Sequence, residues 1–232
     1  MITSTSQFQP SSTTFQPMLA NGLESNQALE THPSVHSKAK RLLDIVGAIV
    51  GLILTAIVAV PVAIAVRFDN PGPLFYSQIR CGLNGRTFRI WKFRSMIVDA
   101  DRLKHLVHNQ AKGNIFKNRN DPRVTRIGRF LRRTSLDELP QFWNVLKGEM
   151  SLVGTRPPTV DEVMNYKRHH YQRLRVKPGI TGEWQVNGRS KVEDFEDIVK
   201  MDIDYQSKWS VGYDLTLVFK TVQVVLNRNG AY

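Results

Sequence analysis

A long uncharged apolar run near the N-terminus constrains the fold more than any other feature. Residues Ile45 to Val66 read IVGAIVGLILTAIVAVPVAIAV and carry no charged side chain. About twenty such residues are what a helix needs to cross the hydrocarbon layer of a bilayer. Pro61 interrupts the run, and a proline inside a helix removes a backbone hydrogen bond and bends the helix axis. The sequence therefore predicts a membrane helix broken at Pro61.

The flanks of this run leave two topologies open. Basic residues lie on both sides of it, namely Lys38, Lys40, Arg41, Arg67, Arg80 and Arg86. Positive charge near the ends of a membrane segment favours the cytoplasmic side. A re-entrant helix that bends at Pro61 would keep both flanks on that side, whereas a spanning helix would export one of them. Because spanning helices also tolerate proline, the residues alone do not choose between the two.

Composition separates a polar N-terminal tail from a basic body. Residues 1–37 contain only Glu24 and Glu30 as formal charges and show no apolar periodicity, which predicts a disordered tail. The chain has a formal net charge of +12. Such a surplus indicates anionic partners, which include nucleotides, nucleic acid and anionic membrane surfaces. Cys81 is the only cysteine, so an intramolecular disulfide is excluded.

The segment after the apolar run predicts a β-hairpin. Leu74–Ile79 and Thr87–Phe93 have strand-like composition and flank the sequence Gly82-Leu-Asn-Gly85. Asn-Gly between two such stretches is a strong hairpin signal. The second strand would carry Lys92 and Arg94 toward its end, although lone basic residues on a strand are usually solvated.

Two further stretches have helical periodicity. Val124, Ile127 and Leu131 form an apolar stripe with arginines on another face, which predicts a basic amphipathic helix suited to an anionic membrane surface. A last helix is predicted from one apolar face, made of Leu215, Val218, Phe219, Val222, Val225 and Leu226. That face suits core packing or the membrane interface, and core packing is the simpler interpretation.

The remaining segments carry weaker signals. Residues 151–158 are turn-forming, and residues 177–189 are loop-rich, with glycines that allow the backbone to approach a ligand closely. The adjacent histidines His169 and His170 lack the helical spacing of metal ligands. They are interpreted as surface side chains.

Two adjacent acids, Asp137 and Glu138, provide the main functional signal. They follow a run of arginines, namely Arg119, Arg123, Arg126, Arg129, Arg132 and Arg133. Nearby cations keep carboxylates ionised, as a nucleophile or metal ligand requires, and guanidinium groups suit phosphate oxygens. The pair therefore indicates a phosphorylated substrate and a divalent cation. A simpler interpretation is a helix start, because Ser135 and Glu138 fit a capping box and Pro140–Lys147 is a predicted helix.

Several motifs together resemble one family. The segments that carry the resemblance are Lys92–Met96, Asn120–Gln141, Lys147–Pro157 and Lys177–Arg189, followed by Asp202, Tyr205, Trp209, Ser210, Asp214 and residues 230–232. In this order they strongly resemble the bacterial sugar transferases, in particular the small monotopic phosphoglycosyl transferases of the undecaprenyl-phosphate galactose or glucose phosphotransferase type. The match covers residues 38–232.

The resemblance implies an enzyme that transfers a sugar 1-phosphate from a UDP-sugar to undecaprenyl phosphate and releases UMP. UDP-galactose and UDP-glucose are the expected donors, and the reaction would start exopolysaccharide, capsule or O-antigen assembly. By position, Asp137 matches the family's nucleophile, which forms an aspartyl-phosphosugar intermediate. Glu138 matches its partner, and both acids are expected to hold Mg²⁺. Further residues match phosphate- or substrate-binding positions: Lys92, Arg156 and Arg189, and more weakly Arg94, Arg133 and Asp202.

The resemblance also implies a placement. It favours a disordered tail at 1–37, a re-entrant helix at 38–67 and a catalytic domain at 68–232 on the cytoplasmic face of the bacterial inner membrane. The expected fold is helix-rich α/β without a Rossmann sheet, because no glycine-rich phosphate fingerprint follows a strand. Expected partners are the UDP-sugar, undecaprenyl phosphate and anionic membrane lipid, without nucleic acid; a homodimer stays open.

Two departures and one alternative accompany this interpretation. Val60 precedes the proline where members often carry serine, and Thr155 stands where many relatives have proline. The chain also lacks the preceding membrane helices and added domain of longer relatives, so we expect a small stand-alone member. The alternative is a catalytically silent adaptor or scaffold that binds anionic lipid or nucleic acid through its basic surface. The intact Asp137-Glu138 pair weighs against that alternative.

Overall fold

The computed structural model describes residues 30–188 and 192–227. Its α-helices are α2 (Lys38–Asp69), α3 (Arg126–Thr134), α4 (Phe142–Lys147), α5 (Val160–Met164), α6 (Glu183–Asn187), α7 (Phe195–Lys208) and α8 (Val211–Leu226). Its strands are β1 (Phe75–Cys81), β2 (Thr87–Phe93), β3 (Ser151–Val153) and β4 (Gly179–Thr181). Short 3-10 helices are η1 (Pro33–Val35), η2 (Leu83–Gly85), η3 (Ala100–Leu106), η4 (Leu136–Gln141) and η5 (Arg168–Arg175).

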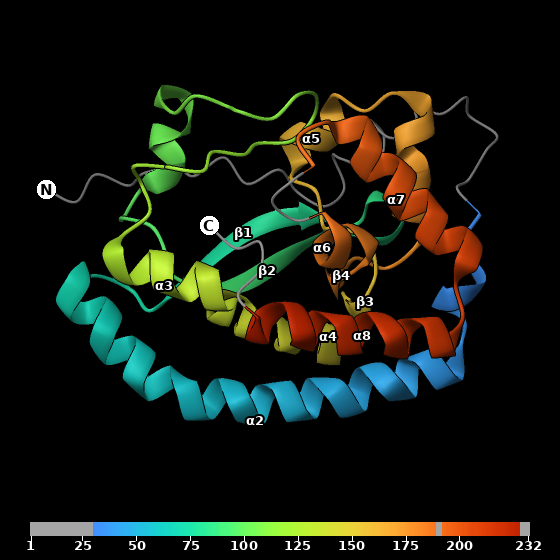
Figure 1. The fold of residues 1–232 in the computed structure, drawn as a ribbon, viewed down its shortest axis with the longest axis horizontal. Coiled ribbons are helices and arrows are strands. Elements are labelled where there is room, and N and C mark those ends of the chain that lie inside the picture. Colours follow the sequence, from blue (N-terminus) through green and yellow to red (C-terminus); the bar gives the residue numbers. More distant parts are fainter. Residues whose placement is uncertain (1–29, 189–191, 228–232) are drawn as a thin grey trace, which may run out of the picture.

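The apolar run forms one continuous helix, α2, of 32 residues. The Ser37 hydroxyl caps its start by accepting a hydrogen bond from the Lys40 N–H. By length and composition α2 is able to cross a membrane: its most apolar 18-residue window has a mean hydropathy of 2.8, and only 17% of that window is buried. Helix α2 runs on through Pro61 to Asp69, so the predicted break at that residue is wrong. The helix curves instead, and both of its ends turn toward the body (Figure 1).

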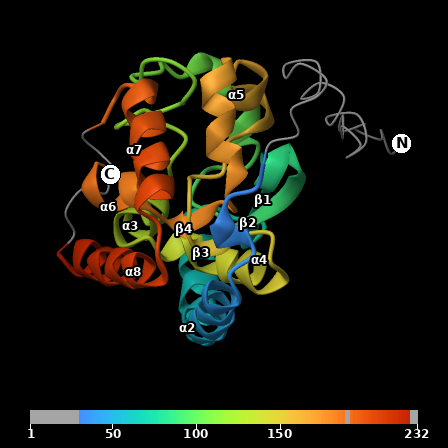
Figure 2. The ribbon, with the colours of Figure 1, turned by 90° about the vertical axis from the view of Figure 1, so that its right-hand side faces the viewer.

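Helix α2 lies along one side of the molecule. Helices α3, α4 and α8 lie next to it, while α5 and α7 lie on the opposite side (Figures 1 and 2). One apolar cluster joins the C-terminal half of α2 to β2, α3 and η4, and its buried members are Val62, Val66, Phe93 and Leu131. Burying each such side chain contributes about 1.5–3 kcal/mol. This cluster therefore fixes the segment with the two acids against the apolar helix.

The predicted hairpin is confirmed. Strands β1 and β2 pair antiparallel, with Tyr76 opposite Lys92 and Arg80 opposite Phe88. Asn84 adopts a left-handed conformation (φ 52°) in the turn, which few residues other than glycine and asparagine do readily. Side chains two residues apart share a face of a strand, so Tyr76, Arg80 and Lys92 lie on the same face of the hairpin.

The strands outside the hairpin form a second pair that the sequence did not predict. Strands β3 and β4, in segments interpreted as loops, pair in parallel, with Ser151 opposite Gly179. A Cβ atom on Gly154 would lie 2.2 Å from the Lys177 carbonyl oxygen, and one on Gly179 would lie 2.1 Å from the Gly154 nitrogen. The glycine at position 179 therefore serves close contact between two backbone segments, not the predicted approach to a ligand.

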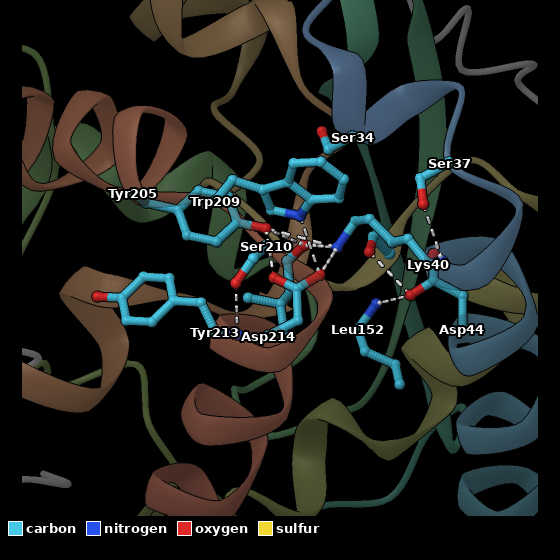
Figure 3. Close-up of polar contacts among 12 residues, drawn as sticks. Ser34, Ser37, Lys40, Asp44, Leu152, Tyr205, Trp209, Ser210, Tyr213 and Asp214 are labelled. Carbon is cyan, nitrogen blue, oxygen red and sulfur yellow. Dashed lines mark hydrogen bonds and ion pairs between the residues drawn. The ribbon is translucent and has the colours of Figure 1, made fainter.

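A buried polar network holds the start of α2 (Figure 3). The Lys40 ammonium donates to the Asp214 carboxylate at 2.6 Å and to the Val153 carbonyl at 3.0 Å. Asp214 also accepts from the Tyr205 hydroxyl at 2.8 Å and from the Trp209 indole N–H at 3.2 Å. Lys40 and Asp214 are both buried. The network ties the apolar helix to β3 and α8 at its N-terminal end.

Two terminal predictions need correction. Residues 30–37, assigned to the disordered tail, include the helix η1, and His32 contacts the body through a hydrogen bond between its imidazole and the Gln206 carbonyl. Residues 1–29 lie outside the described residues.

Core packing was also the wrong interpretation of the apolar face of α8. Leu217 is fully buried, but most of the predicted stripe is exposed, namely Leu215, Phe219, Val222 and Leu226.

Candidate active site

The two acids lie in η4, between α3 and α4. Ser135 ends α3 in a left-handed conformation (φ 57°), and it makes no side-chain cap to η4. The capping-box interpretation is therefore wrong, and the Glu138 N–H donates to the Ser135 backbone carbonyl instead. The predicted helix also begins later than expected: Pro140 belongs to η4, and α4 starts at Phe142.

The turn that carries the acids is held from two sides. Leu136 and Leu139 pack on the cluster formed with α2, and the Leu139 carbonyl accepts a hydrogen bond of 3.1 Å from the Thr55 hydroxyl of that helix. On the other side η4 contacts β2. Asp137, which lies between the two leucines, is only 5% exposed. The acid pair is thus fixed at the body's contact with the apolar helix.

The hairpin brings a cation to the second acid. The Lys92 ammonium lies 2.9 Å from Glu138 Oε1, and each of the two side chains is 25% exposed. A half-buried ion pair of this kind orients both groups while leaving them within reach of a ligand. Position 92 was a predicted phosphate-binding residue, so the structure joins two parts of the predicted site that are distant in sequence.

A second group of charges lies further along the same face of the hairpin. Arg156, a predicted phosphate-binding residue, donates to Glu162 at 3.1 Å. Burial opposes ionisation of Glu162, but the guanidinium groups of Arg156 and Arg80 outweigh it and lower the pKa of Glu162. Burial, reinforced by the charge of Arg156, lowers the pKa of Arg80 to about 10. Arg80 was not predicted as a site residue. The even spacing of Tyr76 and Arg80 along β1, which places both on the face that carries Lys92, was the sequence signal that could have identified it.

Other predicted site residues have structural roles in this arrangement. Arg94 donates to the Pro73 carbonyl and to Asn70, and so fixes the chain just after α2. Asp202 is buried in an ion pair of 2.7 Å with Arg173. Neither set of contacts includes Asp137 or Glu138. Arg133 is exposed on α3.

Arg189 lies outside the described residues. Among the arginines that precede the acids, Arg123 is buried in an ion pair with Asp121 at 2.6 Å, and Arg119 pairs with Glu193 at 2.9 Å. These two arginines form ion pairs with other side chains of the protein.

Arg126 and Arg129 are exposed on α3, which confirms the predicted basic amphipathic helix.

The chemistry of the acid pair fits a magnesium ion. Asp137 and Glu138 are consecutive carboxylates on a short turn, and Mg²⁺ prefers hard oxygen ligands, often one or two carboxylates with substrate phosphates. Glu138 Oε1 contacts the Lys92 ammonium, so Lys92 and a bound Mg²⁺ would bind the same carboxylate.

A separate group of possible metal ligands is formed by His169, His170 and Glu196. The prediction of two surface histidines is wrong for His170, which is buried. Its Nδ1 accepts the Lys167 N–H, so its Nε2 carries the proton and donates to Glu196 at 3.0 Å. Metal-binding histidines usually donate from the nitrogen that does not bind the metal. The arrangement therefore fits a hydrogen-bonded cluster better than a metal site.

Comparison with known proteins matches the chain to one family. Residues 35–228 match the family described as Bacterial sugar transferase. Relatives include the galactosyl transferase CpsE of Streptococcus agalactiae, 54% identical over 198 residues, which are 84% of this chain and 44% of that protein. The undecaprenyl-phosphate galactose phosphotransferase of Salmonella typhimurium is 44% identical over 199 residues, 83% of this chain and 41% of the relative.

The exopolysaccharide production protein ExoY of Rhizobium meliloti is 39% identical over 201 residues, which are 84% of this chain and 88% of that protein. The chain thus spans less than half the length of the first two relatives and most of the third. All of the described acid-pair region lies inside the matched segment. This chain belongs to the bacterial sugar transferase family.

Proposed function

We propose that this protein transfers a sugar 1-phosphate from a UDP-sugar to undecaprenyl phosphate and releases UMP. The observation that carries the proposal is the buried Asp137, fixed against the apolar helix next to the Lys92–Glu138 ion pair. A carboxylate and a cation held at the edge of a membrane helix suit a reaction between a soluble phosphate ester and a lipid phosphate. The names of the relatives support galactose or glucose as the sugar.

A covalent route avoids the repulsion between the two phosphate substrates, both of which are anionic. In the first step a carboxylate oxygen of Asp137 attacks the sugar-bearing phosphorus, a new P–O bond forms, and the bond to UMP breaks. In the second step an oxygen of the lipid phosphate attacks the same phosphorus. The bond to Asp137 then breaks, and the free carboxylate returns.

Other predicted site residues have distinct roles in this scheme. Lys92 and Arg156 offset the charge of the phosphate oxygens. Glu138 orients the lipid phosphate and takes up its proton when that phosphate arrives protonated. A bound Mg²⁺, held by the acid pair, would supply further charge compensation.

The apolar helix supports a re-entrant placement. A curved helix with both ends turned toward the body (Figure 1) keeps both basic flanks on one face of the membrane. We therefore place the body on the cytoplasmic face of the bacterial inner membrane, where nucleotide sugars occur, and expect anionic lipid at its basic helices.

The experiment that tests the proposal is a donor panel. Purified protein in vesicles with undecaprenyl phosphate is given UDP-galactose, UDP-glucose and other UDP-sugars, and released UMP is measured. We expect UMP with one hexose donor and none with Asp137→Asn; normal turnover by that variant would remove Asp137 as the nucleophile. If wild-type protein releases no UMP with any donor, the membrane-anchored adaptor becomes the better explanation.

A further inference from the structure

An apolar groove lies at the C-terminal end of α2. Its volume is about 420 Å³, within the range of small-molecule sites. The residues that line it come from the last turns of α2 and the loop before β1: Ala63, Ile64, Val66, Arg67, Phe68, Gly72 and Leu74. All but one of these are apolar or glycine. The exception, Arg67, places a single cation among them.

The charges around the groove fit an anionic headgroup. Arg67 is exposed and makes no hydrogen bond or ion pair with another described residue. Asp69, the acid nearest to it in sequence, accepts the Ile127 N–H at 2.9 Å and lies close to Arg126 and Arg129 of α3. These two arginines are exposed and add positive charge beside the last turn of α2. A phosphate on a lipid would meet three arginines at this place, and the one acid beside them, Asp69, already accepts a hydrogen bond from α3.

The groove shares residues with the apolar cluster on which η4, the turn with Asp137 and Glu138, packs. Val66 and Leu74 line the groove and also belong to the apolar cluster of α2, β2, α3 and η4. Leu136 and Leu139, which flank the acid pair, pack on the same cluster. A lipid chain in the groove would therefore lie against the element that positions Asp137.

We propose that this groove binds the acceptor lipid, with the isoprenoid chain against Ala63, Ile64 and Phe68 and the phosphate at Arg67. The inference rests on the proposed function, because it takes a polyprenyl phosphate as the acceptor. The acceptor is favoured over bulk phospholipid as the occupant, since the proposed reaction requires the protein to hold the acceptor but not a bulk lipid.

Substitution of groove residues separates this proposal from a general effect on the helix. Ala63→Phe fills the groove, and Ala56→Phe, two helical turns earlier on the exposed surface of α2, is its matched control. Arg67→Gln removes the cation, with the exposed Arg86→Gln as its control. We expect KM for undecaprenyl phosphate to rise about tenfold in Ala63→Phe and Arg67→Gln, with KM for the UDP-sugar unchanged. The controls should stay within about twofold.

A labelling experiment tests the groove without turnover. Wild-type protein in vesicles is irradiated with a diazirine-bearing polyprenyl phosphate, and labelled peptides are identified by mass spectrometry. Labels between residues 63 and 74 that are competed by unlabelled polyprenyl phosphate, but not by excess phosphatidylglycerol, are expected. Labels elsewhere, equal competition by phosphatidylglycerol, or equal KM changes in variants and controls would overturn the groove proposal. Failure of the proposed function would instead appear as absent UMP release by wild-type protein.

Discussion

The Lys92 ammonium and the Glu138 carboxylate form an ion pair of 2.9 Å across 46 residues of sequence. This contact joins the end of the hairpin to the turn that carries Asp137. It places a mobile, compact cation beside the two acids, where a phosphate group of a substrate would need one. Under the proposed function, the pair would orient Glu138 before substrate binds, and Lys92 would then bind the phosphate.

Removing this cation should weaken catalysis more than stability. Hydrogen bonds to charged groups contribute about 1.5–3 kcal/mol, so Lys92→Gln should lower kcat/KM by roughly 10- to 100-fold. The melting temperature should change little, because the pair is partly exposed. Steady-state UMP release and a melting curve check this, with exposed Lys220→Gln as the control. Unchanged kcat/KM would show that Lys92 serves only the fold.

Metal removal should stop turnover if the acid pair holds Mg²⁺. Treatment with EDTA should abolish UMP release, and added Mg²⁺ should restore it, because two substrate phosphates need charge compensation beyond Lys92 and Arg156. Ca²⁺ should restore less, since it prefers more ligands at longer distances. Full activity after EDTA would exclude the ion from the reaction.

The Lys40–Asp214 pair should matter for stability. Lys40→Met leaves the fully buried Asp214 carboxylate without its cation, and breaking a buried pair in this way costs about 3–5 kcal/mol. Lys40→Met combined with Asp214→Leu should recover much of that loss, because no charge is then left buried. Denaturant unfolding in detergent measures both variants. Additive losses in the double variant would show that the two side chains act independently.

The buried His170 should make the protein less stable in mild acid. Burial lowers its pKa below 6.5, so the folded state binds the proton less well than the unfolded state. Its contribution to stability is therefore full above about pH 6.5 and falls as the pH drops below that value. His170→Gln should lose less unfolding free energy between pH 7.5 and 5.5 than wild type.

The exposed His105→Gln provides the control for that measurement. The partner Glu196 has its pKa lowered to about 2 by the hydrogen bonds from His169 and His170. Its titration therefore lies below the tested range and does not obscure the effect. Equal pH slopes for wild type and His170→Gln would contradict the assignment.

The features predicted from sequence are those with local signals. The hairpin follows from Asn84-Gly85 between two strands, and α3 follows from the spacing of Val124, Ile127 and Leu131. The adjacent acids were visible as a pair. The contact between Lys92 and Glu138 was not predicted, because it forms only when β2 packs against η4.

The features missed depend on distant contacts. Strands β3 and β4 are three residues each and pair in parallel, so neither shows alternation of its own. The buried position of His170 and the ion pair of Asp202 with Arg173 arise only when α7 packs on η5. The sequence revealed the apolar stripe of α8 but not which face of the helix is buried. The ion pair between Asp214 and Lys40 buries the face that carries Asp214, and the apolar stripe is left mostly exposed.

Detection of a covalent adduct on Asp137 is the most direct test of the mechanism. Glu138→Gln should keep part of the first step while losing turnover, so the adduct should accumulate when this variant is mixed with a UDP-sugar donor. Rapid quenching and mass spectrometry of the peptide with Asp137 should then show a mass increase of one hexose phosphate, and UMP should appear in an amount equal to that of the adduct. UMP release in cycling wild-type protein without any adduct on residue 137, in wild type or in Glu138→Gln, would contradict the two-step reaction.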